Sequence, residues 1–353
     1  MIAIISDLHI GVHRSDPKYL DWVLKYGGFL KNKLDERKCK HLFILGDVFH
    51  DRKEVSTIAI ETARKFFSMF DGYSIDIIPG NHDCYYENNT NATSLALLSG
   101  WGNIHVHYEP YEINTLNDNA IGLMVPWGFD PTKFKSDVKY AYLMGHFDIT
   151  SFNMTGTQIC EDGWSSDDLF KIAPLVFSGH FHLRSERNYD GGKKIIYVGS
   201  PYELDWGDYG SEKGIYFYDS DSGEIEFIKN DFSPRHVRIQ YDPDIINDKE
   251  KAAEFKKQLK QVEGNIVKLV SENSSEIKQK DLQKVIEIVG RLNPGEFTCD
   301  LKSYNDEEKV ELEISNNLDP KDALLSYIDA TCKEHANEIK AVVMNLFNQI
   351  KKV

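Results

Sequence analysis

The sequence has few cysteines and no long apolar run. Its five cysteines form no Cys-x-x-Cys pair and are odd in number: Cys39, Cys84, Cys160, Cys299 and Cys332. This pattern argues against a disulfide framework and favours a reducing cytoplasm as the location of the protein. No apolar stretch is long enough to cross a bilayer, so we expect no membrane span.

An excess of positive charge is also absent. The chain has 41 Lys and Arg residues against 56 Asp and Glu residues, which gives a formal net charge of -15. A protein that holds nucleic acid by its own electrostatic field is expected to be basic. Any role on nucleic acid must therefore draw its positive charge from bound metal ions or from a partner subunit.

Short apolar runs divide the first two-thirds of the chain. They are Ile2–Ile5, Leu42–Leu45, Ile75–Ile78, Ile104–His107, Ile121–Val125, Tyr140–Met144, Leu175–Phe177 and Ile195–Val198. Runs of this length are typical of buried strands in a parallel or mixed sheet. Between them, Asp16 and Pro17 begin a predicted helix that ends near Leu34, and Ser56 caps a second one that reaches Phe70. The pattern predicts a layered α/β fold.

The remainder of the chain has a different character. Residues 236–303 alternate strand, helix, strand, helix, strand, which predicts a small α+β unit, and an acidic stretch follows at 305–313. Two closing helices are expected, the second with an apolar face between Ile339 and Ile350. We therefore predict a domain at 1–232, a small α+β domain at 233–304, an acidic linker at 305–318 and a helical segment at 319–353.

Five of the predicted strands run into polar motifs. These are Asp7-Leu8-His9, Gly46-Asp47, Gly80-Asn81-His82-Asp83, Gly145-His146 and Gly179-His180-Phe181-His182. Because ligands gather beyond the carboxyl ends of strands in open α/β sheets, we expect these side chains to converge. The glycines allow sharp turns and a close approach of the backbone to an ion.

The residue types in these motifs suit a pair of metal ions. The candidate ligands are Asp7, His9, Asp47, Asn81, His146, His180 and His182. Imidazole, carboxylate and amide groups without thiolate fit Mn, Fe or Zn at a catalytic position better than a structural zinc. Seven ligands are too many for one ion and fit two. Two ions about 3.5–4 Å apart clamp the attacking and leaving oxygens of a phosphoryl displacement.

In this order the five motifs resemble the calcineurin-like metallophosphoesterases. The stretch Gly46-Asp47-Val48-Phe49-His50-Asp51-Arg52 is similar to the DNA-repair nucleases of the SbcD / meiotic-recombination-eleven type, and the compact length resembles their phage recombination versions. The motifs span residues 7 to 182. The resemblance implies a β-sandwich flanked by helices, with a small α+β capping domain and C-terminal helices.

The resemblance also implies residue roles. Asp7, His9 and His182 would hold one ion, Asn81, His146 and His180 the other, and Asp47 would bridge them. The catalytic candidates are His82, facing the scissile phosphate, Asp83, orienting that imidazole, and His50, steering the DNA end. Arg52 and Arg184 are candidates for phosphate contacts, with solvated surface roles as the alternative. One departure is that Lys53-Glu54-Val55 follows Arg52 where the family often has proline.

The activity implied by the resemblance is that of a DNA nuclease subunit. It would be a 3′-to-5′ exonuclease on duplex ends and an endonuclease on single strands, with two divalent ions, Mn²⁺ first and Mg²⁺ as an alternative. An SbcC-type coiled-coil ABC ATPase would bind the C-terminal helices, and helices at 56–70 and 93–99 would form a homodimer. If the gene belongs to a phage, the location is the host cytoplasm.

Two other functions stay open at this point. The first is a generic phosphodiesterase or phosphatase acting on small nucleotides or phosphoproteins, which the acidic charge favours slightly. The second is a non-catalytic scaffold of a repair complex that keeps a relic site. The complete ligand set and His82 argue against the scaffold.

Overall fold

The computed structural model describes residues 1–86, 89–114, 121–131, 138–156, 158–271, 278–301 and 340. The predicted acidic linker at 305–318 lies outside these residues, and so does the helical segment at 319–353 except for Lys340. The four-part division of the chain stays a prediction.

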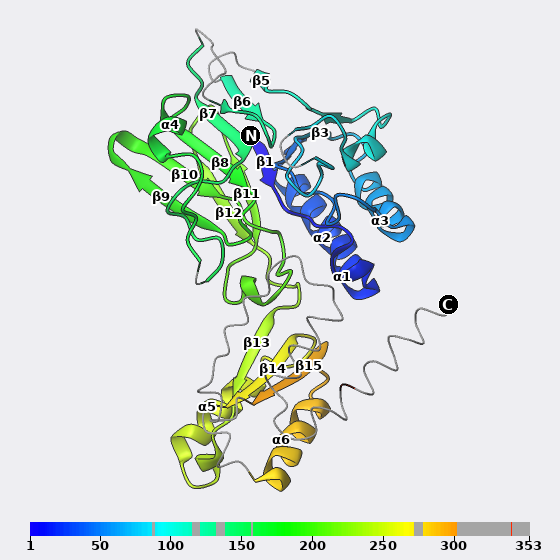
Figure 1. Ribbon diagram of the computed structural model, residues 1–353, viewed down its shortest axis with the longest axis vertical. Coiled ribbons are helices and arrows are strands. Elements are labelled where there is room, and N and C mark those ends of the chain that lie inside the picture. The colour runs from blue at the N-terminus through cyan, green and yellow to red at the C-terminus, as the bar shows by residue number, and fades with distance from the viewer. Residues whose placement is uncertain are drawn as a thin grey trace.

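The first sheet has six strands in the order β12-β11-β1-β2-β3-β4 (Figure 1). Their bounds are β1 Ile2–Ile5, β2 His41–Ile44, β3 Ser74–Ile77, β4 Ile104–Val106, β11 Gly214–Tyr218 and β12 Ile225–Lys229. Strands β1 to β4 are parallel, whereas β11 and β12 add an antiparallel edge. The sequence patterns predicted the parallel strands but not β11 and β12.

The second sheet also has six strands, in the order β5-β6-β7-β8-β10-β9. Their bounds are β5 Tyr111–Asn114, β6 Ile121–Val125, β7 Tyr142–His146, β8 Leu175–Gly179, β9 Ser185–Tyr189 and β10 Lys193–Tyr197. Strands β6, β7, β8 and β10 are parallel, and β5 and β9 are antiparallel edges. As in the first sheet, several carboxyl ends therefore point to one edge.

The two sheets pack face to face. Ile4 and Phe43 of the first sheet share one apolar core with Met144 and Phe177 of the second. Because strand side chains alternate between faces, Ile5 next to Ile4 points the other way, into the core beneath the helices. The predicted layered α/β sandwich is confirmed.

Helices cover the outer face of the first sheet. They are α1 Val12–Ser15, α2 Pro17–Glu36 and α3 Thr57–Ser68. The Asp16 side chain caps α2 by accepting a hydrogen bond from the Lys18 amide at 2.8 Å, and Ser56 caps α3 in the same way from Ala59 at 3.2 Å. Both predicted helix starts are therefore correct. The shorter elements are α4 Ser166–Phe170, η1 Ser94–Leu98, η3 Asp190–Gly192, η4 Trp206–Asp208 and η5 Pro243–Ile246.

A third, smaller unit follows the sandwich. It consists of β13 His236–Gln240, α5 Lys249–Leu259, β14 Ile266–Ser271, α6 Gln279–Arg291 and β15 Glu296–Leu301. Its three strands are parallel in the order β13-β14-β15. Ile239, Leu269, Phe255 and Val289 contribute to a core of its own. The predicted alternation of strands and helices is correct here.

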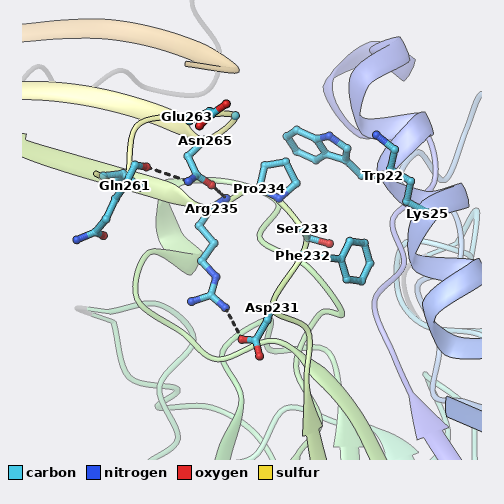
Figure 2. Close-up of a pocket in the computed structure, with 12 residues that line it drawn as sticks. Trp22, Lys25, Asp231, Phe232, Ser233, Pro234, Arg235, Gln261, Glu263 and Asn265 are labelled. Atoms are coloured by element: carbon cyan, nitrogen blue, oxygen red, sulfur yellow. Dashed lines mark hydrogen bonds and ion pairs between the residues drawn. The ribbon is translucent and has the colours of Figure 1, made fainter. Parts of the chain in front are cut away.

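The small unit meets the sandwich beside α2 (Figure 2). The Arg235 side chain donates to Asp231 within the connecting segment at 3.3 Å, and its backbone amide donates to Asn265 of the small unit at 2.7 Å, which ties this segment to the small unit. A cavity of about 640 Å³ lies between this segment and Trp22 of α2.

None of the helices in the described ranges combines the length and the apolar character required to span a bilayer.

Candidate metal centre

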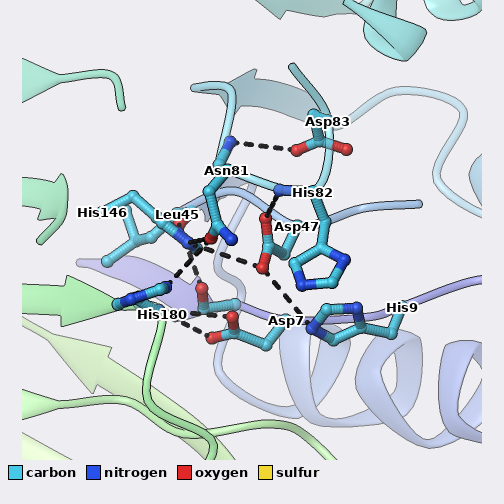
Figure 3. Close-up of polar contacts among 12 residues, drawn as sticks. Asp7, His9, Leu45, Asp47, Asn81, His82, Asp83, His146 and His180 are labelled. Atoms are coloured by element: carbon cyan, nitrogen blue, oxygen red, sulfur yellow. Dashed lines mark hydrogen bonds and ion pairs between the residues drawn. The ribbon is translucent and has the colours of Figure 1, made fainter. Parts of the chain in front are cut away.

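All five predicted motifs meet at one edge of the sandwich (Figure 3). The backbone there is unusual, because Asp7, Asp47 and His180 adopt positive φ angles of 56°, 54° and 89°. Such a conformation in a residue other than glycine costs on the order of 1–3 kcal/mol and is concentrated at functional sites. Gly80 is required as well, since a Cβ at this position would lie 2.2 Å from Oδ1 of Asp47.

The first cluster consists of Asp7, His9 and His182. One ligand atom from each residue lies within 4.8 Å of the others. Asp7 is fully buried and His9 is almost fully buried. The Nε2 atoms of His9 and His182 are 3.0 Å apart, so two imidazole nitrogens face the same point.

The second cluster consists of Asn81, His146 and His180. The amide oxygen of Asn81 lies 3.0 Å from Nε2 of His146 and 2.9 Å from Nδ1 of His180. Figure 3 shows this oxygen between the two rings. The three side chains come from different strand ends: Asn81 lies in the loop after β3, His146 is the last residue of β7, and His180 follows β8.

Asp47 joins the two clusters. Its Oδ2 atom lies 3.5 Å from Nε2 of His9 and 3.5 Å from Nε2 of His146. Its other oxygen accepts a hydrogen bond from the His82 amide at 2.8 Å, which fixes the carboxylate plane. The donor set therefore fits two cations, one on each side of a shared carboxylate, as two-metal sites require.

The charges of these buried groups are strongly coupled. Burial raises the pKa of Asp7 and lowers the pKa of His9 well below its usual value. Burial alone would raise the pKa of Asp47, but the surrounding histidines, His146 first and then His9 and His82, together hold that pKa well below its usual value. For His146, burial lowers the pKa, yet Asp47, Asp7 and the Leu45 carbonyl together bring it to about 9.

The second cluster is supported from behind. Nδ1 of His146 lies 2.6 Å from the carbonyl oxygen of Leu45, and Nε2 of His180 lies 2.8 Å from Oδ1 of Asp148. A carbonyl accepts but cannot donate, so Nδ1 of His146 carries the hydrogen and Nε2 points into the site. Such contacts orient metal-binding imidazoles and raise their basicity.

Asp148 was not among the residues predicted from the sequence. Its signal is weak, because its partner His180 lies 32 residues further along the chain. The spacing of Asp148 two residues after His146 is the one local hint. Asp208 was missed as well: it lies 3.9 Å from Nδ1 of His182 and is paired with the buried Lys213 at 2.8 Å.

His50 and His82 lie beside the first cluster. Their rings stack with centroids 5.4 Å apart, and the His82 ring is 4.8 Å from the His9 ring. Nδ1 of His50 lies 3.2 Å from Nδ1 of His9, and Nδ1 of His82 lies 2.6 Å from the backbone oxygen of His50. The structure therefore brings both predicted histidines to the rim of the metal centre.

Asp83 is placed differently from the sequence expectation. Its carboxylate accepts hydrogen bonds from the amides of Gly80, Val48 and Phe49 at 3.0, 3.3 and 3.1 Å. We expected a contact between this carboxylate and the His82 ring. Among the described residues no such hydrogen bond forms, because the His82 ring turns toward His50 instead. Burial, followed by the charge of Asp47, raises the pKa of Asp83 to about 7.

The two predicted arginines differ in their surroundings. Arg184 forms ion pairs with Glu186 at 3.2 Å and Glu212 at 3.4 Å, and its guanidinium stacks over the Phe227 ring at 4.0 Å. These contacts hold the Arg184 guanidinium against neighbouring acidic side chains. Arg52 is half-buried in the loop that follows β2.

With this geometry in view, the chain can be assigned to a class of protein. Residues 1–215 match the family model of the calcineurin-like phosphoesterases. The chain belongs to this family, and it is a hydrolase of phosphate esters in which His and Asp clusters are placed to bind divalent metal ions.

A particular relative is similar over much of its length. The chain is 27% identical over 254 residues to "Exonuclease subunit 1" of Enterobacteria phage T4, which covers 68% of this chain and 70% of that protein. Two solved structures are also similar. The nuclease MPE of Pseudomonas putida has a TM-score of 0.30 and 18% identity, covering 64% of this chain and 86% of that one. A dimetal phosphatase from Danio rerio has a TM-score of 0.37 and 11% identity, covering 61% and 91%.

Proposed function

We propose that this chain is a Mn²⁺-dependent DNA nuclease subunit. It acts as a 3′-to-5′ exonuclease on duplex ends and as an endonuclease on single strands, in DNA break processing and recombination. The observation that carries the chemistry is the position of Asp47 between two ligand clusters, 3.5 Å from a histidine of each. The similarity to phage T4 "Exonuclease subunit 1" supports DNA as the substrate.

The residues around the proposed ion pair have distinct tasks. Asp7, His9 and His182 hold one ion, and Asn81, His146 and His180 hold the other, with Asp47 shared. When bound, the two ions supply positive charge to the phosphate oxygens and activate the attacking water. The buried carboxylates keep the ions in place, and the strained backbone at Asp7 and Asp47 aims those carboxylates inward.

His82 is the residue proposed to act on the substrate itself. It lies at the rim, half-buried, with Nδ1 against the backbone oxygen of His50. A ring that donates from Nδ1 to a carbonyl has its Nε2 atom directed away from that contact. There it can stabilise charge on the phosphate or protonate the leaving 3′ oxygen. His50 stacks on this ring and limits its rotation.

The proposal is tested by comparing two substrates with and without Mn²⁺. We expect the chain to degrade a duplex oligonucleotide from its 3′ ends only with the ion present, and to cut it with a higher kcat/KM than a simple phosphodiester. Asp47→Asn is the matched inactive control. If the simple diester is hydrolysed well while neither duplex nor single-stranded DNA is cut, the DNA assignment is overturned.

We also propose a partner, an SbcC-type coiled-coil ABC ATPase bound through residues 319–353. The support is the apolar face between Ile339 and Ile350 in the sequence and the word "subunit" in the name of the T4 relative. Such a partner would supply the basic DNA platform that a chain of net charge -15 lacks. Undiminished complex formation after deletion of residues 315–353 would contradict this docking.

The net charge favours one alternative, a phosphodiesterase acting on small nucleotides or phosphoproteins. It would use the same ligands and differ only in substrate. The comparison of oligonucleotide and simple diester above decides between the two. The cytoplasmic location and the homodimer stay predictions.

A further inference from the structure

An aromatic cleft lies beside the second cluster. Its volume is about 360 Å³. The residues that line it come from three segments: Trp127, Gly128, Phe129 and Asp130; His146, Phe147 and Asp148; and Gly163 and Trp164. Four of the lining residues are therefore bulky aromatics, and none of the roles assigned above involves them.

The fold builds this cleft at the same edge as the metal centre. Trp127 and Phe129 follow the carboxyl end of β6, and Asp148 follows that of the neighbouring parallel strand β7. The third wall is fixed by backbone hydrogen bonds, since the amide of Trp164 donates to Asp148 at 2.8 Å and the amide of Thr150 donates to Trp164 at 3.1 Å. Backbone pairing therefore holds two of the three walls together.

The cleft and the metal centre share a wall. The Trp127 ring lies 5.1 Å from the His180 ring and 5.9 Å from the His146 ring. His146 is among the residues that line the cleft and also faces Asp47. A molecule whose phosphate rests at the metal centre therefore has this cleft within reach of its next chemical group.

The residues that line the cleft indicate which part of the substrate it can bind. Asp130 and Asp148 line the cleft, so a second phosphate would meet acidic residues there. Flat heteroaromatic rings stack well on tryptophan and phenylalanine, and any base has a face suited to this.

We propose that this cleft binds the base of the nucleotide whose phosphate ester lies at the metal centre. The inference rests on the proposed nuclease function and adds a recognition site to it. The cleft of about 360 Å³ has room for a single base, and a base that enters it must leave the stack of the duplex. The substrate strand must therefore present that base unpaired, as at a frayed end or in a single strand, which costs least where pairing is already lost.

Two substitutions test the cleft without touching the ligands. Phe129→Ala and Trp164→Ala remove stacking walls, whereas Trp127 is avoided because it packs on His146 and His180. The matched control is Phe232→Ala, an exposed phenylalanine that lines the separate cavity beside α2. All variants are assayed with Mn²⁺ on two diesters that share a leaving group: deoxyadenosine 5′-(p-nitrophenyl phosphate) and methyl p-nitrophenyl phosphate.

We expect each cleft variant to lower kcat/KM for the nucleoside diester by about 10-fold or more, in line with the loss of base stacking, and to leave the methyl diester unchanged. Phe232→Ala should change neither. A second readout needs no catalysis: 2-aminopurine deoxyribonucleoside 5′-monophosphate, with Mg²⁺ present, should lose fluorescence when it binds the wild-type protein and lose less with Trp164→Ala.

Two outcomes would overturn the proposed base site. One is that the variants match the wild-type protein in kcat/KM for both diesters and in fluorescence quenching, and the other is that kcat/KM falls equally for both diesters. These outcomes are distinct from failure of the nuclease proposal. In that case the wild-type protein would hydrolyse the methyl diester but leave DNA oligonucleotides intact.

Discussion

The two halves of the metal centre use similar ligands but differ in what lies behind them. In the second cluster, His146 rests on the Leu45 carbonyl at 2.6 Å and His180 on Asp148 at 2.8 Å. In the first cluster, His9 faces another imidazole, His50, at 3.2 Å, and His182 lies 3.9 Å from Asp208. The second half is therefore the more firmly oriented, and the first half borders the histidines that would meet the substrate.

This contrast predicts an order of metal binding. An imidazole held by a carboxylate or carbonyl is pre-aligned and more basic, so the second cluster should fill first in a titration. The first cluster should bind its ion more weakly, while its neighbours His50 and His82 contribute to the reaction.

The largest effect is expected from Asp47→Asn, which removes the carboxylate common to both halves. We predict a loss of activity of about 10³-fold or more, because both ions lose a ligand at once. Calorimetry should show fewer than two Mn²⁺ bound per chain at concentrations that saturate the wild-type protein. Full activity with two ions would remove Asp47 from the shared position.

His82→Ser should separate catalysis from metal binding. We predict a fall in kcat of about 10²–10⁴-fold, the range for loss of a general acid, with both ions still bound. Steady-state kinetics and a Mn²⁺ titration of the same sample measure the two effects. Unchanged cleavage would exclude His82 from the reaction.

Asp148→Asn tests the support behind the second cluster. The asparagine amide oxygen carries no full negative charge, so it accepts the hydrogen bond from His180 more weakly than the carboxylate does. Mn²⁺ affinity at the tighter site should therefore fall by about 10–100-fold. The exposed Asp167→Asn is a matched control and should change nothing. If both variants bind Mn²⁺ as the wild-type protein does, the carboxylate does not support His180.

The affinity of the second cluster should also depend on pH. Burial alone would lower the pKa of His146, but Asp47, Asp7 and the Leu45 carbonyl together outweigh it and the pKa is about 9 in the metal-free protein. Because this folded-state pKa is raised, the ring is protonated at neutral pH and must lose that proton to bind an ion. Mn²⁺ affinity should therefore rise from pH 7 to 9, by up to about 10-fold per unit. Calorimetry in buffers of different ionisation enthalpy should detect the released proton.

The smallest effect is expected from Ile58→Asp on the exposed face of α3. Ile58 is 50% exposed, and the predicted homodimer places this helix at the interface. We predict a shift from dimer to monomer in light scattering, with Mn²⁺ binding unchanged. A monomeric wild-type protein would show that the helix predicted at 56–70 has no such role.

The sequence predicted well which side chains converge, because each follows an apolar run. A ligand at a strand end is visible in a short window, and this holds for Asp7, Asn81 and His180 alike. The supporting residues were not visible, since Asp148 and Asp208 act on rings 32 and 26 positions away. Such contacts depend on how β7, β8 and the later loops are arranged, which no local pattern specifies.

The fold also combines features that local sequence patterns predicted with features that they did not. The parallel strands and the caps at Asp16 and Ser56 were predicted from local patterns. The antiparallel strands β11 and β12 were missed, although Gly214–Tyr218 is a fully buried apolar run. The orientation of Asp83 also could not be predicted, because three backbone amides from two loops compete for its carboxylate.

Crystals grown with Mn²⁺ and measured at the manganese absorption edge give the most direct test of the two-ion centre. We expect two anomalous peaks about 3.5–4 Å apart, one within bonding distance of His9 and the other of His146, with Asp47 touching both. A single peak, or two peaks that do not share Asp47, would contradict the two-ion centre.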